Sequence, residues 1–293
     1  DAQESRGLGD VYKRQAFKLT NEGIILATPL VLFMWLITLY LSFAKGVVDT
    51  IPEAASAFVT LLCMLGAFCS GWFFMVRKTI EISKKEFILD EDRAKATVNL
   101  IKTIPAGIGK YFLSFIGMFL IFLVLFGLFD ILVYKFGIHF IGKIDFSAIQ
   151  LKNAMASPQE MKVFLDSLTD TQLLKLSQWN LLFMAATSFI SFIFMLWIPE
   201  IIYKTVNPLM ALLKSIKKVF IKFPKSLALF IYMTFLNLII SFASTFAMLN
   251  IIIYMIMMIV YFYFMVYIIV LIFSYYDSEF NREDEEHIEQ QQK

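Results

Sequence analysis

The residues that could perform acid–base or metal chemistry are few and scattered in this chain. Its two histidines, His139 and His287, lie far apart in the sequence, and His139 is interpreted as a solvated loop residue. The sequence has no HExxH motif, no phosphate-binding Walker loop and no glycine-rich dinucleotide turn. We therefore predict no catalytic residue, no cofactor and no metal site, and expect a protein that is not an enzyme.

Two carboxylates stand at the margins of long apolar segments, where ionisable side chains are candidates for function. Asp130 lies toward the end of one such segment, close to Lys135. Glu200 follows Pro199 at the end of another, and it precedes Lys204 by four residues, the favourable order for an ion pair on a helix. An interfacial ion pair is the preferred interpretation of both acids, and a transport site is the alternative.

A polar stripe runs along one face of a further apolar segment. Its members recur at steps of three or four residues, which places them on one side of a helix. They are Thr234, Asn237, Ser241, Ser244 and Thr245. Hydrogen bonding between packed helices is the favoured interpretation. The alternative is the wall of a cavity that holds a small solute or a lipid headgroup.

The elements that must position these residues are membrane-spanning helices. The chain is 59% hydrophobic and 16% aromatic, against roughly 45–50% apolar residues in soluble domains. From Ser226 to Tyr276 it has no charged residue or histidine, and one helix of that length would measure about 75 Å against a hydrocarbon core of about 30 Å. This run must therefore fold back once, as a hairpin of two spans that turns within Ser244–Asn250.

Six spans result when the other charge-free stretches are added to this hairpin. The predicted fold is an all-α membrane domain over residues 16–276, with spans at about 23–44, 54–76, 110–134, 176–203, 226–246 and 249–276. Trp179 and Trp197 would mark the two interfaces of the fourth span.

Small residues recur at steps of four in the second predicted span. Gly66 pairs in this way with Ser70, and Ala67 pairs with Gly71. Such pairs allow two helix backbones to approach closely in a membrane. We therefore expect a close helix contact along this face.

Basic residues concentrate in two connections, which the positive-inside rule places in the cytoplasm together with both termini. Each connection has an amphipathic stretch that meets a proline before the next span, Ala94–Ile104 with Pro105 and Leu209–Phe223 with Pro224. We predict two basic elbow helices in the membrane interface, and a third, eroded copy at Ala16–Pro29. Their lysines would face anionic headgroups: Lys95, Lys102, Lys214, Lys217, Lys218 and Lys222.

The remaining segments lie outside the bundle. A short outer amphipathic helix is predicted to begin at the capping box Ser157–Glu160, and Thr169–Gln172 repeats the cap before the fourth span. Residues 1–15 are interpreted as a sequencing-adaptor artefact. Residues 277–293 carry seven acids against Arg282 and Lys293, which predicts a disordered acidic tail.

Six spans in repeated units of an elbow and a span, with elbows that end at Pro105 and Pro224, resemble a group of bacterial six-helix membrane proteins. The group includes the YciC-like proteins and the membrane domain attached to some glycerophosphodiester phosphodiesterases. The resemblance covers most of residues 16–276 and is architectural, so no catalytic residue is carried over. It implies an accessory membrane module.

The leading hypothesis is a non-enzymatic protein of the bacterial inner membrane whose elbows bind anionic lipid. Its helix bundle would organise lipids or partner proteins, which include a second copy of the chain. The alternative is a transporter or permease for a small solute or a lipid, with a cavity lined by the polar stripe. No nucleic-acid partner is expected.

Overall fold

The computed structural model describes residues 12–14, 16–21, 24–84, 95–96, 98–143, 152, 154, 157–247 and 250–281. Over these residues the regular structure is helical throughout, with nine α-helices and no strand. Six helical segments are long and apolar enough to cross a membrane, and they match the predicted spans in order: Ala27–Ala44, Ile51–Ser83, Leu100–Phe140, Asp170–Tyr203, Phe223–Thr245 and Ile251–Asn281.

The chain divides into two compact units, which we describe separately. The main unit comprises Asp1–Phe119 and Ile193–Lys293, and it includes the predicted hairpin of residues 226–276. The second unit comprises Leu120–Phe192, and we call it the hairpin unit. The long helix α5 (Ile104–Phe140) contributes its first part to the main unit and its second part to the hairpin unit.

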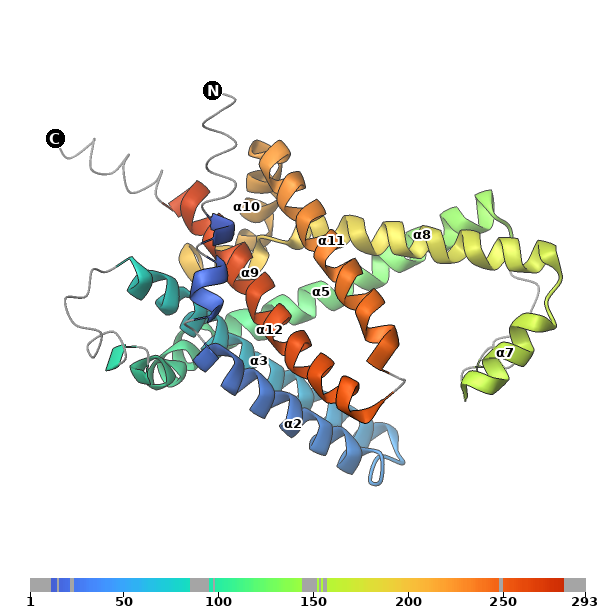
Figure 1. Cartoon of the computed structure of the whole chain (residues 1–293), viewed down its shortest axis with the longest axis horizontal. Coiled ribbons are helices and arrows are strands. Elements are labelled where there is room, and N and C mark those ends of the chain that lie inside the picture. Colours follow the sequence, from blue (N-terminus) through green and yellow to red (C-terminus); the bar gives the residue numbers. More distant parts are fainter. Residues whose placement is uncertain are drawn as a thin grey trace. The chain divides into compact units, whose positions relative to one another are not determined.

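Three long helices pack side by side in the main unit: α2 (Ala27–Ala44), α3 (Ile51–Ser83) and α12 (Ile251–Tyr276) (Figure 1). Aromatic side chains join α3 to its neighbours, because the Phe73 ring stacks 5.7 Å from Phe115 of α5 and 5.9 Å from Phe273 of α12. The Trp72 indole donates a 2.9 Å hydrogen bond to the carbonyl of Leu26, just before α2. Aromatic side chains therefore form much of the contact between α3 and its neighbours.

The predicted close helix contact is present between α3 and α5. A Cβ built on Gly107 of α5 would lie 2.8 Å from the carbonyl oxygen of Ser70 and 3.0 Å from the Cα of Gly71. Gly71 in turn faces Ile104, and Gly66 faces Ile116. The backbones can approach this closely only because glycines occupy both sides of the contact.

Helices α11 (Phe223–Ala247) and α12 form the predicted hairpin. They contact one another, and Asn250 caps α12 by accepting a 2.8 Å hydrogen bond from the backbone N–H of Ile252. The turn lies where the sequence predicted it, although residues 248–249 are outside the described part of the chain. Tyr232 and Tyr267 add a hydroxyl–hydroxyl hydrogen bond of 3.0 Å between the two helices.

The fourth predicted span is broken rather than continuous. Helix α8 (Asp170–Phe194) ends before Met195 and Leu196, and α9 (Trp197–Tyr203) begins after them. The break follows from Pro199, whose ring clashes with the carbonyl four residues earlier, at Met195. The two tryptophans expected at the interfaces are both 3% exposed. The Trp197 indole donates a 2.8 Å hydrogen bond to the carbonyl of Pro208, which holds the next helix against α9.

The hairpin unit contains the rest of α5, the short helix α7 (Pro158–Asp166) and most of α8. Both predicted helix caps are in place, and the one before α8 is a full capping box. The Ser157 hydroxyl accepts from the backbone N–H of Glu160, and Thr169 and Gln172 bond reciprocally before α8. Trp179 packs on Gly137 and donates a 3.1 Å hydrogen bond to the carbonyl of Gly142, which ties α8 to the end of α5.

Gly137→Ala is expected to lower the free energy of unfolding by about 1 kcal/mol. The added methyl group would overlap the Trp179 ring, so the indole must move and lose its bond to Gly142. Unfolding in mixed detergent micelles, followed by tryptophan fluorescence, measures the change. Gly127→Ala on the same helix is the matched control, since nothing lies within 4 Å of a Cβ at that position. Equal stabilities of the two variants would contradict the packing argument.

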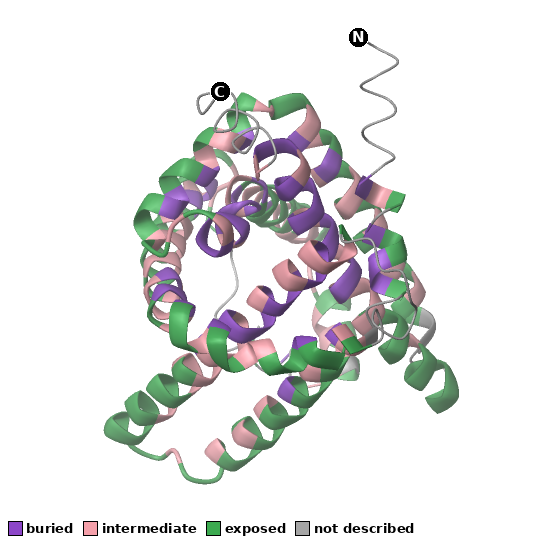
Figure 2. Cartoon of the chain, turned by 90° about the vertical axis from the view of Figure 1, so that its left-hand side faces the viewer, coloured by how far each residue is buried: buried purple, intermediate pink, exposed green. Residues whose placement is uncertain are grey.

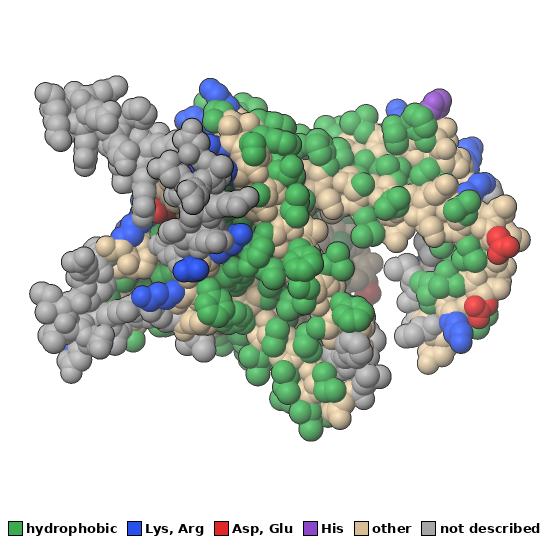
Figure 3. Space-filling model, turned by 45° about the horizontal axis from the view of Figure 1, so that its top comes forward, with side chains coloured by type: hydrophobic (Ala, Val, Ile, Leu, Met, Phe, Trp, Pro, Cys, Tyr) green, Lys and Arg blue, Asp and Glu red, His purple; other side chains and the backbone are tan. Residues whose placement is uncertain are grey.

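Much of the helical surface is apolar and exposed, as expected where lipid is the solvent. Figure 2 shows long stretches of helix that are exposed or half-buried. Only 17% of the most apolar window of α11 is buried inside the chain, although its mean hydropathy is 2.0. In the space-filling view, hydrophobic side chains cover a broad area, with Lys and Arg gathered beside it (Figure 3). Apolar surface of this extent is stable only against lipid or other apolar partners.

Candidate functional site

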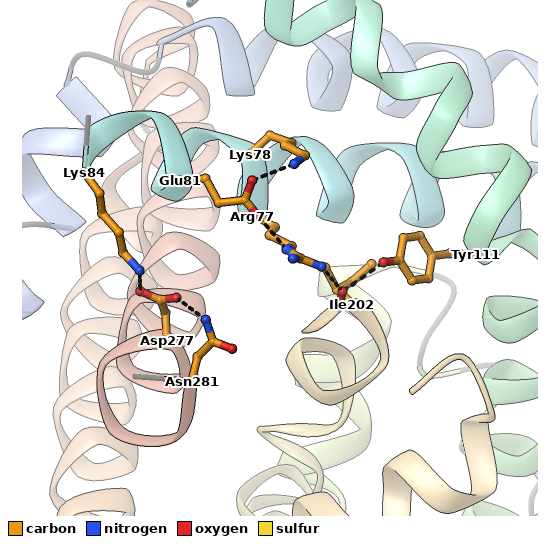
Figure 4. Close-up of polar contacts among 8 residues, drawn as sticks. All are labelled: Arg77, Lys78, Glu81, Lys84, Tyr111, Ile202, Asp277 and Asn281. Atoms are coloured by element: carbon orange, nitrogen blue, oxygen red, sulfur yellow. Dashed lines mark hydrogen bonds and ion pairs between the residues drawn. The ribbon is translucent and has the colours of Figure 1, made fainter. Parts of the chain in front are cut away.

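Charged side chains from four parts of the main unit meet at one end of it. We call this group the polar cluster, and it comprises Arg77, Lys78, Glu81, Lys84, Glu200, Lys218, Lys222, Lys225, Asp277 and Glu279. The end of α3, helix α9, the elbow helix α10 (Pro208–Ile221) with the start of α11, and the segment after α12 supply these residues. Figure 4 shows the part of the cluster around Arg77 and Asp277.

Glu200 is the most deeply buried acid of the polar cluster. Its side chain is 1% exposed, and its Oε2 atom lies 2.8 Å from Lys218 Nζ and accepts a 2.5 Å hydrogen bond from the Tyr276 hydroxyl. Lys218 also donates a 2.6 Å hydrogen bond to that hydroxyl. The triangle of Glu200, Lys218 and Tyr276 therefore joins α9, α10 and α12.

The prediction that Lys204 pairs with Glu200 is wrong. Lys204 is exposed, and the cation beside the Glu200 carboxylate is Lys218, from the following helix. The break before α9 and the short connection at 204–207 turn α10 back against α9. A partner from another helix is better placed than an i+4 neighbour because Glu200 faces the protein interior.

The segment after α12 differs from the predicted disordered tail. Residues Asp277–Asn281 form a turn of π-helix that continues α12, and Asp277 and Glu279 are buried. Asp277 forms a 2.6 Å ion pair with Lys84 and accepts a 3.2 Å hydrogen bond from Asn281. Glu279 binds lysines at the elbow. The acids remain ordered because each meets a cation of another helix, and residues 282–293 are outside the described part of the chain.

Arg77 closes the C-terminal end of α9. Its Nε atom bonds Glu81 at 2.7 Å, its Nη1 atom donates a 2.7 Å hydrogen bond to the carbonyl of Ile202, and its guanidinium lies 4.9 Å from the centre of the Tyr203 ring. The Tyr111 hydroxyl donates to the same carbonyl at 2.9 Å (Figure 4). The last carbonyls of a helix have no partner within it, and a cation there also matches the helix dipole.

The elbow helix α10 is present, and small as well as large residues form its buried face. Its buried residues are Ala211, Leu212, Ser215 and Val219. Three large residues of the predicted apolar face are exposed, Leu209 at 52%, Leu213 at 57% and Phe220 at 52%. Small residues let α10 lie close to α9, which leaves the larger apolar side chains for another apolar environment.

The lysines of α10 fall into two groups. Lys214 and Lys217 are exposed. Lys218 is bound to Glu200, and the Nζ atom of Lys222 is 3.8 Å from Glu279. The structure thus separates exposed lysines from lysines that pair with carboxylates of the protein.

The first predicted elbow is only partly described. Residues 95–96 and 98–99 are helical, and Leu100–Thr103 forms a 3₁₀ turn before α5, so the stretch is not one α-helix up to Ile104. Leu100 is buried, whereas Val98 and Ile101 are exposed, and so are Lys95 and Lys102. Of the eroded third copy, residues 16–21 are helical, Ile24–Leu26 forms a 3₁₀ turn, and Pro29 lies inside α2.

The polar stripe lies on an exposed face of α11. All five of its residues are exposed, and the hydroxyls of Ser244 and Thr245 donate to the carbonyls of Ser241 and Phe242 in their own helix. Exposure of the stripe in the single chain leaves both expectations, a helix-packing face and a cavity wall, untested. Its role as a site stays a prediction.

The other candidates from the sequence do not come together. Asp130 is half-buried within α5, which continues to Phe140, so it does not lie at the end of that helix as expected. His139 lies in the last turn of α5 rather than in a loop, and His287 is outside the described residues. Over the described ranges no group of three or more His, Cys, Asp or Glu could hold a metal ion.

No family model matches the chain, and no curated protein and no solved structure matches it either. Its class therefore rests on the helices themselves. Six of them are long and apolar enough to span the bilayer, and at most 39% of the most apolar window of any of them is buried inside the chain. The protein is a multi-pass integral membrane protein with six candidate spans. The resemblance to the bacterial six-helix group stays a prediction.

Proposed function

We propose that this protein is a non-enzymatic membrane protein that binds anionic phospholipid headgroups through its elbows and organises lipids or partner proteins around its helices. The observation that carries the proposal is the exposed side of α10. It places Lys214 and Lys217 beside a row of exposed apolar side chains at Leu209, Leu213 and Phe220. Such a helix is suited to lie in the interface, with its apolar side chains in the acyl region and its ammonium groups among the phosphates.

The first elbow supports the same interpretation. Lys95 and Lys102 are exposed together with Val98 and Ile101, so cationic and apolar side chains again share an exposed surface. By the positive-inside rule we assign both elbows to the cytoplasmic face, where anionic lipids attract basic residues with about 1 kcal/mol per lysine. The localisation that we propose is the bacterial inner membrane, with both termini in the cytoplasm.

The polar cluster supports the proposal by fixing the elbow against the bundle. Lys218 and the Trp197 indole hold α10 from its buried side, through Glu200 and the carbonyl of Pro208. A helix that is anchored in this way presents its lysines at a constant depth, so less conformational entropy is lost when a headgroup binds.

Replacing Lys214 and Lys217 together with Gln is expected to weaken binding of phosphatidylglycerol about tenfold or more, since each lysine contributes about 1 kcal/mol. Native mass spectrometry of the delipidated protein, titrated with dioleoyl-phosphatidylglycerol, measures the apparent affinity. The paired change leaves Lys218 and Lys222 in place, because these two hold carboxylates of the protein.

Lys135→Gln with Lys162→Gln is the matched control. It removes the same charge at exposed positions of the hairpin unit. Binding that falls equally in both double variants would show a non-specific effect of net charge. Binding that is unchanged by the loss of Lys214 and Lys217 would overturn the proposed function.

A further inference from the structure

Glu279 sits between two lysines at the junction of α10 and α11. Its Oε1 and Oε2 atoms accept hydrogen bonds from Lys225 Nζ at 2.9 and 2.8 Å, and Oε2 lies 3.8 Å from Lys222 Nζ. The Glu279 side chain is 5% exposed, whereas those of Lys222 and Lys225 are 26% and 38% exposed. The carboxylate is therefore covered by protein, whereas the two lysine side chains are partly exposed.

Exposed aromatic side chains flank these lysines. Phe220 and Phe223 stack with their ring centres 6.2 Å apart and are 52% and 41% exposed. Lys222 lies between them in the sequence, and Lys225 follows in the first turn of α11. An exposed phenylalanine pair at the start of a span fits the boundary between acyl chains and headgroups. In the proposed orientation, Lys222 and Lys225 would stand at the depth of lipid phosphates.

We propose that Lys222 and Lys225 form a second binding site for a lipid phosphate, and that the carboxylate of Glu279 occupies this site in the structure until an anionic phospholipid displaces it. The inference rests on the proposed function and adds to it a site that the chain itself regulates. Phosphate oxygens accept hydrogen bonds from two ammonium groups as carboxylate oxygens do, so the same pair of lysines fits both. The surrounding bilayer keeps lipid at a high local concentration, and Glu279 belongs to the same chain as the two lysines. Both competitors are therefore always close to the lysines.

Displacement of Glu279 has a structural consequence. Glu279 lies two residues after Asp277, which binds Lys84 at the end of α3, and three residues after Tyr276, which binds Glu200. Release of its carboxylate removes one of the contacts that hold the π-helical turn. Lipid binding at this site therefore loosens the connection between α12 and the elbow.

Glu279→Gln is the direct test. It removes the competing charge, and we expect the apparent affinity for dioleoyl-phosphatidylglycerol to rise about threefold to tenfold in native mass spectrometry. Glu279→Asp, which keeps the charge but shortens the reach, should raise it less, and it serves if the Gln variant does not fold. Lys222→Gln with Lys225→Gln should lose one bound phosphatidylglycerol relative to the unchanged protein.

Three controls define the site. Glu160→Gln changes net charge equally on an exposed helix of the hairpin unit and should leave affinity unchanged. Dioleoyl-phosphatidylcholine tests the need for a net negative headgroup, and inorganic phosphate tests the need for a lipid. Glu279→Gln affinity equal to that of the unchanged protein or of Glu160→Gln would overturn the inference, and so would inorganic phosphate that competes as well as the lipid.

The outcome for this site is separable from the outcome for the proposed function. A loss of lipid binding on replacement of Lys214 and Lys217, with no gain on Glu279→Gln, would keep the proposed function and reject the second site. A gain on Glu279→Gln that disappears when Lys222 and Lys225 are also replaced would support the second site, even if Lys214 and Lys217 proved dispensable.

Discussion

Glu200→Gln is expected to lower the free energy of unfolding by about 3–5 kcal/mol, the cost of breaking a buried ion pair by removing one partner. The Glu200 side chain is 1% exposed and that of Lys218 is 19% exposed, so the ammonium group left behind is largely shielded from water. The amide of Gln fills the same volume but cannot balance this charge. Unfolding in mixed detergent micelles, compared at equal protein and detergent concentrations, measures the loss.

A double-mutant cycle separates the charge effect from simple loss of packing. Lys218→Met in the Glu200→Gln background should recover part of the lost stability, because the uncompensated charge is then gone. Glu81→Gln is the matched control in the same cluster. Its ion pairs with Arg77 and Lys78 are 25–35% exposed, so its loss should cost about 1 kcal/mol or less. If the two Gln variants are equally stable, Glu200 is not the buried anchor that the structure describes.

The sequence predicts the features of this fold that depend on neighbouring residues. The charge-free run to Tyr276 must fold back because of its length alone, and Asn250 caps the second helix of the hairpin as polar residues near a turn commonly do. The caps at Ser157 and Thr169 follow from spacing in the same way. The caps depend on the spacing of a few successive residues, and the hairpin depends on the length of the charge-free run. Local spacing and segment length can both be read directly from one sequence.

Contacts between distant segments could not be predicted. Nothing in the sequence links Glu200 to Tyr276, which are 76 residues apart and meet only because α9 and α12 pack together. The i+4 neighbour Lys204 was the natural expectation, since only local spacing was known. For the same reason the acidic composition after Tyr276 predicted a tail. One signal was available in the sequence. The positive-inside rule predicts that the basic connections and the C-terminal segment lie on the same side of the membrane, so lysines could be expected near these acids.

The faces of α10 show a second limit of periodicity. In a soluble protein the larger apolar residues of an amphipathic helix face the core, whereas Leu213 and Phe220 of α10 are exposed. Next to a membrane, lipid competes for these side chains, and small residues such as Ala211 and Ser215 allow the closer protein contact. A pattern of apolar and small residues therefore indicates which faces are nonpolar, but not which of them contacts protein.

The break before α9 was within reach of sequence reasoning. Pro199 predicts a kink, and the clash of its ring with the carbonyl four residues earlier places that kink at Met195. The structure has its break at Met195 and Leu196.

Gly107→Ala is expected to cost about 2–3 kcal/mol of stability, since overpacking a tight contact forces the backbone to shift. A Cβ at this position would lie 2.8 Å from the carbonyl oxygen of Ser70 and 3.0 Å from the Cα of Gly71. These are backbone atoms of α3, which cannot turn aside as the end of a long side chain can. The cost should appear in the same unfolding assay, together with weaker protection of α3 amides from hydrogen exchange.

Gly109→Ala gives the matched control two residues further along α5. No atom lies within 4 Å of a Cβ built there, so the substitution should be neutral or should stabilise the helix by up to about 1 kcal/mol. Both changes add one methyl group to the same helix, so the difference between them isolates the contact with Ser70 and Gly71. If Gly107→Ala were also neutral, α3 and α5 would have room between them, and the close approach of their backbones could not be what joins these two helices.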